Sequence, residues 1–540
     1  MSSEPLNPKQ RETRSKFALA LISVAVIVVI LLLRGCHQQG RKSAELQKYR
    51  KSAYSILSTT WNHFKNREGF EGDWWSEKFK HPKMIGDDGR PNAFMDGGDQ
   101  DNDGIKDIDW SDPKKPFELA AVSESGSYAL LRAVWMKDRQ AFDRVWNWVK
   151  DNLQHSEMKY VYFWKDVNSP DNGWRHVDEL GIDRDHLFSW RWSPTIAERD
   201  RKGIREDGVI YYRWQPPSEG HNPNEPWRDG WDSATDADQD IALALIYADK
   251  LWGSRKGDKY QDYAHNAQQV LNDIWKKETY VKREYRYLAG GNGLRAIEPG
   301  YLSPFSYRVF DDFDPEHNWL DLVDSSYRIF RDSSTAMLSS WIDKRGISHN
   351  QNPHKRQRWP RANLVPDWLS LDKNGQVVDG AEREEAEFGT DAFRALWRVA
   401  VDYAWNRDKR AAEYLKQLSS SGPYDFLYYR LHDKRGDWKK TPNYNESQKL
   451  ASVYWHDGGY TMYEGNYEPD PGKTYVENQT ASRANCGQYG VYLSYFYASY
   501  LMAPNSKSFD MIERLVSPLI TPEANGFSKR SYMIPEDQLK

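Results

Sequence analysis

The sequence predicts an all-α fold built from successive helical hairpins that are joined by long polar loops. Three observations support this prediction. Apolar side chains recur with helical spacing in six segments after residue 44. Strand-like alternation is sparse, and no short repeat is visible, so a solenoid of short repeats is not favoured. With 540 residues, the chain is long enough for one large domain with a substantial core.

The six predicted helices each carry a stripe of apolar side chains on one face. In chain order, these side chains are Tyr54, Leu57, Trp61 and Phe64; Leu130, Leu131, Val134 and Trp135; Phe142, Val145, Trp146 and Val149; Ile241, Leu245, Ala248, Leu251 and Trp252; Leu320, Val323, Tyr327 and Phe330; and Phe393, Leu396, Trp397, Val401 and Ala404. The loops at 68–118, 154–235 and 333–366 are rich in Gly, Pro, Asp and Trp. Loops of this length in a compact domain usually carry function.

Residues 17–33 form one long apolar stretch, FALALISVAVIVVILLL, which contains one Ser and no charge. As a helix rising about 1.5 Å per residue, it barely crosses a hydrocarbon core of roughly 30 Å. Basic residues flank it, and the positive-inside rule favours a cytoplasmic N-terminus. The alternatives are a cleaved signal peptide, although no A-x-A site follows, and a lipoprotein signal ending at Cys36, although Arg34 disrupts its lipobox. We expect an uncleaved signal anchor, with a short cytoplasmic N-terminus over 1–16, a transmembrane helix over 17–34, a linker over 35–47 and one large domain over 48–540 outside the cytoplasm.

Composition excludes several classes of protein. Aromatic residues make up 14% of the chain, which excludes global disorder, and a single apolar stretch excludes a polytopic membrane protein. The net charge of -4 argues against nucleic-acid binding, and two Cys cannot build a disulfide framework or a Cys-rich metal site. The mean hydropathy of -0.88 is low for a chain with 24 Trp and 33 Tyr. The rings either fill the core or line a wet groove that stacks on a ring-shaped ligand.

Acidic residues stand at the start of three predicted helices. Glu124 lies in SESGSY, Asp236, Asp238 and Asp240 lie in SATDADQD, and Asp391 lies in GTDAFR. Helix capping is the structural alternative for each of them, because Asp and Ser before a helix are ordinary N-caps. If the helices close into a ring, however, their N-termini converge at one rim. One protonated and one ionised carboxyl in a shared cleft are what hydrolysis of a polysaccharide needs.

The segment at 233–253, SATDADQDIALALIYADKLWG, resembles the signature of family 8 glycoside hydrolases. Further segments resemble the family in the same order, and they are SESGSY at 123–128, FDRVWNWVKDNL at 142–153, EPGYLSPF at 298–305, DSSYR at 324–328, LVPDW at 364–368, DAFR at 391–394 and VDYAW at 401–405. The resemblance spans roughly residues 48–500. It implies an (α/α)6 toroid in the domain over 48–540, with inverting, endo-acting cleavage of β-1,4-linked glucan, xylan or chitosan.

The resemblance also implies a role for five residues. Glu124 matches the general acid, Asp236 the acid that holds the sugar at the cleavage point, and Asp391 the general base. Arg394 matches the arginine that supports the base, and Tyr301 matches the tyrosine near the cleaved sugar.

The chain departs from the family at several positions near this predicted site. Thr390 stands where the family usually has Tyr, Glu298 replaces an Asn, and Ser125 follows Glu124 where glycine is typical. These departures bear on the substrate more than on the fold. We expect a β-1,4-glucan such as cellulose. The alternatives are xylan, chitosan or another exopolysaccharide, a glycan-binding protein without catalysis, and a lyase on a similar toroid.

Four aromatic residues lie in the long loop before Asp236, and they are Trp190, Trp192, Tyr212 and Trp214. The resemblance implies sugar-stacking rings in this region, while packing beneath the loop is an equal alternative for each ring. We assign Trp397 to the substrate-binding set as well, although its spacing fits the core equally.

One further motif predicts an ion site. Asp99, Asp101 and Asp103 alternate along the chain and are followed by Gly104, as in the first half of a calcium loop, and Asp107 comes three residues later. The twelfth position is Trp110 instead of the Glu of an EF-hand, so a variant loop and a solvated acidic loop are both open. Catalysis by paired carboxyls needs no cofactor, which leaves calcium a structural role. The expected partners are a polysaccharide, the membrane and, by analogy, a polysaccharide synthase complex, with no nucleic acid.

Overall fold

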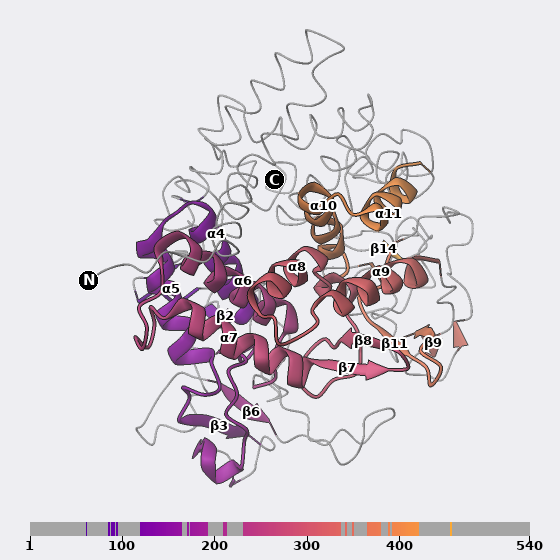
Figure 1. Cartoon of the computed structure of the whole chain (residues 1–540). Helices are drawn as coiled ribbons and strands as arrows, with labels where there is room; N and C mark the ends of the chain where they lie inside the picture. Colours follow the sequence, from indigo (N-terminus) through magenta and orange to yellow (C-terminus); the bar gives the residue numbers. More distant parts are fainter. Residues whose placement is uncertain are drawn as a thin grey trace, which may run out of the picture.

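The computed structural model describes the central part of the chain (Figure 1). The described residues are 61, 85–86, 88–91, 93–94, 119–164, 170–171, 173–192, 209–212, 231–335, 341–342, 348–349, 364–379, 387–388, 391–420 and 454–455. Among them, no helix is long and apolar enough to cross a membrane. The predicted anchor over 17–34 and the Asp99–Asp107 loop both lie outside the described residues and stay predictions.

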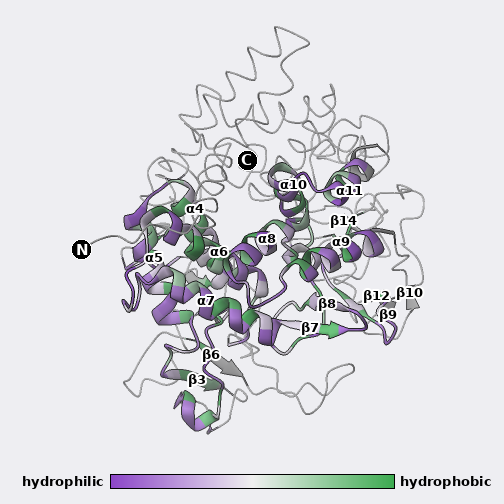
Figure 2. Ribbon diagram, viewed as in Figure 1, coloured by the Kyte–Doolittle hydropathy of each residue, from purple (hydrophilic) through white to green (hydrophobic). Residues whose placement is uncertain are grey.

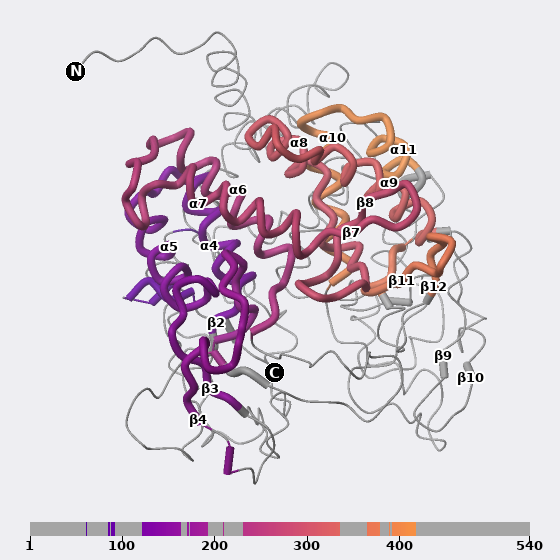
Figure 3. The backbone as a smooth tube through the Cα atoms, turned by 60° about the horizontal axis from the view of Figure 1, so that its bottom comes forward, coloured from indigo at the N-terminus to yellow at the C-terminus, as the bar shows by residue number. Residues whose placement is uncertain are grey.

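The described α-helices follow one another in pairs along the chain. They are α4 (Ser123–Trp135), α5 (Arg139–Leu153), α6 (Thr235–Trp252), α7 (Tyr263–Asp273), α8 (Pro304–Phe313), α9 (Leu320–Thr335), α10 (Arg394–Asn406) and α11 (Lys409–Ser420). Each pair packs together as a hairpin, and α4, α6, α8 and α10 also pack side by side in that order. Figures 1 and 3 show this row, with α10 and α11 beside α8 and α9. The prediction of successive helical hairpins is confirmed for these residues.

Five of the six predicted apolar stripes fall on helices, namely α4, α5, α6, α9 and α10. Of the first stripe, only Trp61 is described, and it is buried. Helix α6 is buried on every side from Thr235 to Ala248, as expected for a helix enclosed by others. Figure 2 shows green, apolar residues along α4, α6 and α10, where they form part of one continuous core.

Short strands supplement the helices, so the prediction of a purely α-helical fold was incomplete. Within the described ranges, two sheets have three strands each: β1 (Ala93–Phe94), β2 (Leu119–Val122) and β5 (Arg191–Trp192), and β4 (Gly173–His176), β3 (Tyr160–Trp164) and β6 (Ile210–Tyr212). Antiparallel pairs join β7 (Thr279–Lys282) with β8 (Tyr285–Leu288), β9 (Trp341–Ile342) with β10 (Ser348–His349), β11 (Leu369–Leu371) with β12 (Val377–Asp379), and β13 (Glu387–Phe388) with β14 (Tyr454–Trp455). These strands have two to five residues, too few for a clear period-2 pattern.

Strand pairing brings distant loops to the start of the inner helices. β2 leads directly into α4 and pairs with β5, so Val122 lies opposite Arg191. The Ser123 N–H donates to the Trp190 carbonyl at 2.9 Å, and the Thr235 N–H donates to the Gly290 carbonyl at 3.3 Å. The chain before α4 and the chain before α6 are therefore both held by loop backbone.

A second junction brings the turn before α10 next to the short 3-10 helix η3 (Pro299–Tyr301). The backbone of Ile297 pairs with that of Leu369, which places Glu298 beside the loop that precedes β11. Gly300 lies so close to the turn that a Cβ atom there would fall 1.9 Å from the Asp391 carbonyl oxygen. Only glycine permits this approach of η3 to Asp391.

Candidate active site

Glu124 is the second residue of α4, and it does not cap the helix. The N-cap residue is Val122, whose N–H donates to the Ser125 hydroxyl at 3.3 Å. Burial raises the pKa of Glu124 to about 7, with a further contribution from the charge of Asp236, although Arg394 opposes the shift. The carboxyl therefore carries a proton over much of the range below neutral pH. This is the state that a general acid needs.

Asp236 is the second residue of α6, and its carboxylate is completely buried. No side chain caps this helix, so the capping alternative does not hold for Asp236. Its Oδ2 accepts a hydrogen bond from Arg394 Nη1 at 2.5 Å and lies 3.8 Å from Arg398 Nη2. Its Oδ1 has no hydrogen-bond partner among the described residues. One oxygen is thus fixed by arginine, while the other remains an acceptor for a ligand hydroxyl.

Asp391 lies in the turn that precedes α10, and its side chain is 32% exposed. Arg394 Nη2 donates to Asp391 Oδ1 at 2.5 Å. The turn is held from the other side, because the Ala392 N–H donates to Asp367 Oδ1 at 2.6 Å. A carboxylate that is anchored through one oxygen and partly open to solvent suits the activation of a water molecule.

Arg394, the first residue of α10, connects the two acids. Its guanidinium binds Asp236 through Nη1 and Asp391 through Nη2, and its Cζ atom lies 4.9 Å from the centre of the Tyr301 ring. The negative charges of Asp236 and Asp391 also act on the titration of Glu124. The structure therefore brings together all five residues that the family resemblance singled out.

A second ion pair lies deeper in the same interface between α6 and α10. Arg398 donates through Nη1 and Nη2 to the two carboxylate oxygens of Asp240, both at 3.0 Å, and both side chains are completely buried. Arg398 was not predicted from the sequence. Its role could have been predicted from the spacing of charges along the chain. Asp236 and Asp240 are four residues apart on one face of α6, and Arg394 and Arg398 have the same spacing on one face of α10.

The aromatic residues that were predicted to stack on sugar differ in how deeply they are buried. Trp192 is 2% exposed and packs edge-on against Trp148 at 5.2 Å, which favours the alternative of packing beneath the loop. Trp190 is partly exposed, and Tyr301 contacts Trp368 edge-on at 6.1 Å. Trp397 is partly buried against Phe305 at 5.6 Å. Tyr212 lies on β6 with its side chain outside the described part, and Trp214 lies outside it entirely.

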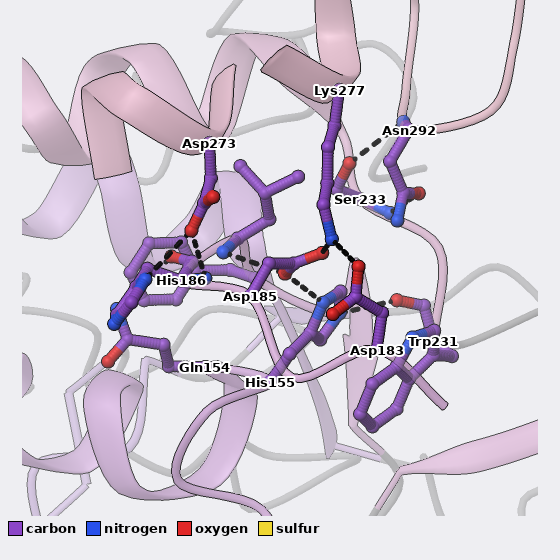
Figure 4. A network of polar contacts seen from close by, with 12 residues as sticks. Gln154, His155, Asp183, Asp185, His186, Trp231, Ser233, Asp273, Lys277 and Asn292 are labelled. Atoms are coloured by element: carbon purple, nitrogen blue, oxygen red, sulfur yellow. Dashed lines mark hydrogen bonds and ion pairs between the residues drawn. The ribbon is translucent and has the colours of Figure 1, made fainter. Parts of the chain in front are cut away.

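A buried polar network fixes the segment that leads into Asp236, and sequence reasoning missed it (Figure 4). One ring nitrogen of His155 lies 2.6 Å from Asp185 Oδ1 and the other 2.8 Å from the Trp231 carbonyl oxygen, and the imidazole stacks on the indole with centroids 4.0 Å apart. Lys277 donates to Asp185 at 2.6 Å. Burial opposes ionisation of Asp185, but His155 and Lys277 together lower its pKa.

Beside this network, Glu278 accepts a hydrogen bond from the Ser233 hydroxyl and interacts with Asp238, whose Oδ1 accepts from the Phe188 N–H at 3.0 Å. Burial raises the pKa of both carboxyls, that of Glu278 to about 7. Asp238, the acid at the fourth position of α6, therefore belongs to this buried polar network. In the part of the chain that the structure describes, no cluster of His, Cys, Asp and Glu could hold a metal ion.

Comparison with known proteins matches part of the chain to one family. Residues 111–194 and 201–346 match the sequence profile described as Glycosyl hydrolases family 8. Endoglucanase C of Ruminiclostridium cellulolyticum is 31% identical over 303 residues, which are 55% of this chain and 46% of that protein. The reducing-end xylose-releasing exo-oligoxylanase Rex8A of Paenibacillus barcinonensis is 21% identical over 294 residues, or 53% of this chain and 56% of that protein.

Among solved structures, that of Rex8A complexed with xylose aligns with 85% of this chain and 85% of its own, at 16% identity and a TM-score of 0.45. The chain spans about half the length of the curated relatives it matches. Residues 111–194 and 201–346, which contain Glu124, Asp236 and Tyr301, are thus a region of the family 8 glycosyl hydrolase type, as the motifs predict.

Proposed function

We propose that this protein is an inverting, endo-acting glycoside hydrolase that cleaves β-1,4-linked polysaccharide. Glu124 is the general acid, Asp391 the general base, and Asp236 the acid that holds the sugar at the cleavage point. The observation that carries the proposal is the contrast between these carboxyls. Glu124 holds its proton to about pH 7, whereas Asp236 and Asp391 are both ion-paired to Arg394.

The protonated Glu124 suits the acid step of the reaction, and the ion-paired Asp391 suits the base step. Glu124 gives its proton to the glycosidic oxygen as the bond to the leaving sugar breaks. Asp391 accepts a proton from the water molecule that attacks the opposite face of the ring, so a β-linkage yields an α-configured product. The unpartnered Oδ1 of Asp236 accepts a hydrogen bond from a sugar hydroxyl. Arg394 keeps Asp236 and Asp391 in a fixed relation throughout the reaction.

We further propose that the hairpins belong to an (α/α)6 toroid. Two features support this arrangement. Helices α4, α6, α8 and α10 form a row in which each contacts the next, and α5, α7, α9 and α11 pair with them in turn. Glu124 and Asp236 occupy the same position, the second residue of their inner helices, and Asp391 comes just before a third. In a closed ring, these ends would surround one cleft.

The leading substrate is a β-glucan such as cellulose, since several relatives are named endoglucanases. Xylan is the second candidate, because Rex8A is named as an exo-oligoxylanase. Within the same proposal, the segment over 17–34 anchors the enzyme in the cell membrane with its catalytic domain outside the cytoplasm. There it could act beside a polysaccharide synthase, and calcium would have only a structural role at Asp99–Asp107.

A panel of polysaccharides tests this proposal. The purified chain is incubated with carboxymethyl cellulose, mixed-linkage β-glucan, xylan and chitosan, and new reducing ends are measured. We expect the largest release from a β-glucan, with a rapid fall in viscosity that marks internal cleavage. Release from xylan or chitosan alone would move the assignment to that polymer. No release from any of them would favour a glycan-binding protein, and unsaturated products that absorb in the ultraviolet would identify a lyase.

A further inference from the structure

Glu298 is a fourth acid at the candidate site, and the reaction described above does not use it. It immediately precedes η3, and its side chain is completely buried. Neither carboxyl oxygen has a hydrogen-bond partner among the described residues. Oε1 lies 3.4 Å from Arg394 Nη2, farther than the 2.5 Å that separates this nitrogen from Asp391 Oδ1. Glu298 is therefore a third carboxyl beside a guanidinium that already serves two.

The surroundings of Glu298 contain more negative than positive charge. Asp236 approaches from α6, Asp391 from the turn before α10, and Asp367 from the loop before β11. Arg394 of α10 opposes them with its positive charge. On η3 itself, burial raises the pKa of Tyr301, so that phenol is neutral and adds no charge.

These surroundings favour the protonated form of Glu298. A buried carboxylate without a hydrogen bond is unstable, and its proton removes most of the cost. Burial raises the pKa of Glu298 well above its usual range, and Asp391 raises it further against the opposing effect of Arg394. With Glu298 neutral, the two N–H edges of Arg394 remain available to Asp236 and Asp391.

We propose that Glu298 is a positioning residue for the base. In its protonated form it leaves the Arg394 guanidinium to Asp236 and Asp391, and when it ionises it draws Arg394 Nη2 away from Asp391. This inference rests on the proposed function, because it assumes that Asp391 activates the water. The family resemblance has a permanently neutral Asn at this position, whereas this chain carries a group that titrates. Turnover then requires two protonated carboxyls, Glu124 and Glu298.

The pH dependence of kcat distinguishes this role from a merely structural one. When two groups must hold protons, log kcat falls with a slope of about -2 per pH unit above both pKa values, and with one group the slope is about -1. We expect the steeper slope in the wild type and the shallower one in Glu298→Gln, whose amide is a neutral substitute for the protonated acid. Below pH 6 the kcat of this variant should stay within about threefold of the wild-type value, since it lacks only an ionisation that has not yet occurred.

Glu278→Gln is the matched control, because Glu278 is also a buried acid with a raised pKa but interacts with Ser233 and Asp238 below the site. Its slope should equal that of the wild type. A wild-type slope of about -1, or an unchanged steep slope in Glu298→Gln, would overturn the inference. A loss of about 100-fold at every pH would overturn it as well, because the Glu298 carboxyl itself would then take part in the reaction.

Thermal unfolding provides a readout that does not depend on hydrolysis. The folded state holds the Glu298 proton more tightly than the unfolded state, so wild-type stability falls as pH rises from the unfolded pKa towards the folded one. Glu298→Gln lacks this loss, and its Tm relative to the wild type should be higher at pH 8 than at pH 5. An equal Tm difference at both pH values in an active hydrolase would contradict the inference alone. A growing Tm difference in a chain that hydrolyses no glycan would instead contradict the proposed function.

Discussion

Glu124→Gln should lower kcat by about 10²–10⁴-fold, because a neutral amide cannot donate a proton to the leaving sugar. The change is nearly isosteric, and Glu124 is already protonated below about pH 7, so little folding stability should be lost. The KM for the best polysaccharide should change little, since the amide still fills the same space. Reducing-end release at saturating substrate measures the loss, and the Tm of the variant shows whether the fold is retained.

Two comparisons sharpen this result. Glu284→Gln makes the same chemical change on the exposed turn between β7 and β8, and it should leave kcat unaltered. Asp391→Asn should reduce kcat by a similar factor to Glu124→Gln, because the amide cannot accept the proton of the attacking water. Turnover of Glu124→Gln at a near-wild-type rate would remove Glu124 from the role of general acid.

Arg398→Met should destabilise the protein by about 3–5 kcal/mol, the usual effect of removing one partner of a buried ion pair. Arg398 and Asp240 are both completely buried and joined by two hydrogen bonds of 3.0 Å. Without the guanidinium, the Asp240 carboxylate stays buried with no counterion, and Asp236 loses the cation that lies 3.8 Å away. Urea denaturation at neutral pH gives the change in the free energy of unfolding.

The matched control is Arg331→Met, which removes an arginine that is 66% exposed and pairs with Asp332 at 2.8 Å. Exposed pairs contribute only about 0–1 kcal/mol, so this variant should stay close to the wild type. Replacing both buried partners, as in Asp240→Leu with Arg398→Met, should cost less than Arg398→Met alone, because no unpaired charge remains. Equal losses for Arg398→Met and Arg331→Met would show that the buried pair does not support the interface between α6 and α10.

The sequence predicted those parts of the fold in which one pattern continues over several turns. The stripes through Leu130 and Ile241 fall on α4 and α6, because a buried helix face repeats its apolar residues over more than ten positions. The strands escaped prediction because β5, for example, has only two residues and depends on pairing with β2. Trp192 on β5 was assigned to a sugar site because its loop position carries no information on burial.

The candidate site likewise contains residues that the sequence predicted and residues that it did not. Glu124, Asp236, Asp391 and Arg394 were identified by motifs, and their acid–base roles remain proposals. The network around His155 could not be predicted, since its partners lie 30 and 76 residues away and meet only in the folded chain. Arg398 could have been found by asking which cations match the four-residue spacing of the acids on α6.

The anomeric configuration of the first product tests the central claim most directly. Proton NMR of a cleavage reaction, recorded before mutarotation equilibrates the new reducing end, separates the α- and β-anomers. If Glu124 and Asp391 act on opposite faces of the sugar, cleavage of a β-1,4-glucan should give the α-anomer first. The β-anomer as the first product would contradict this account, because it would require a covalent intermediate in place of direct attack by water.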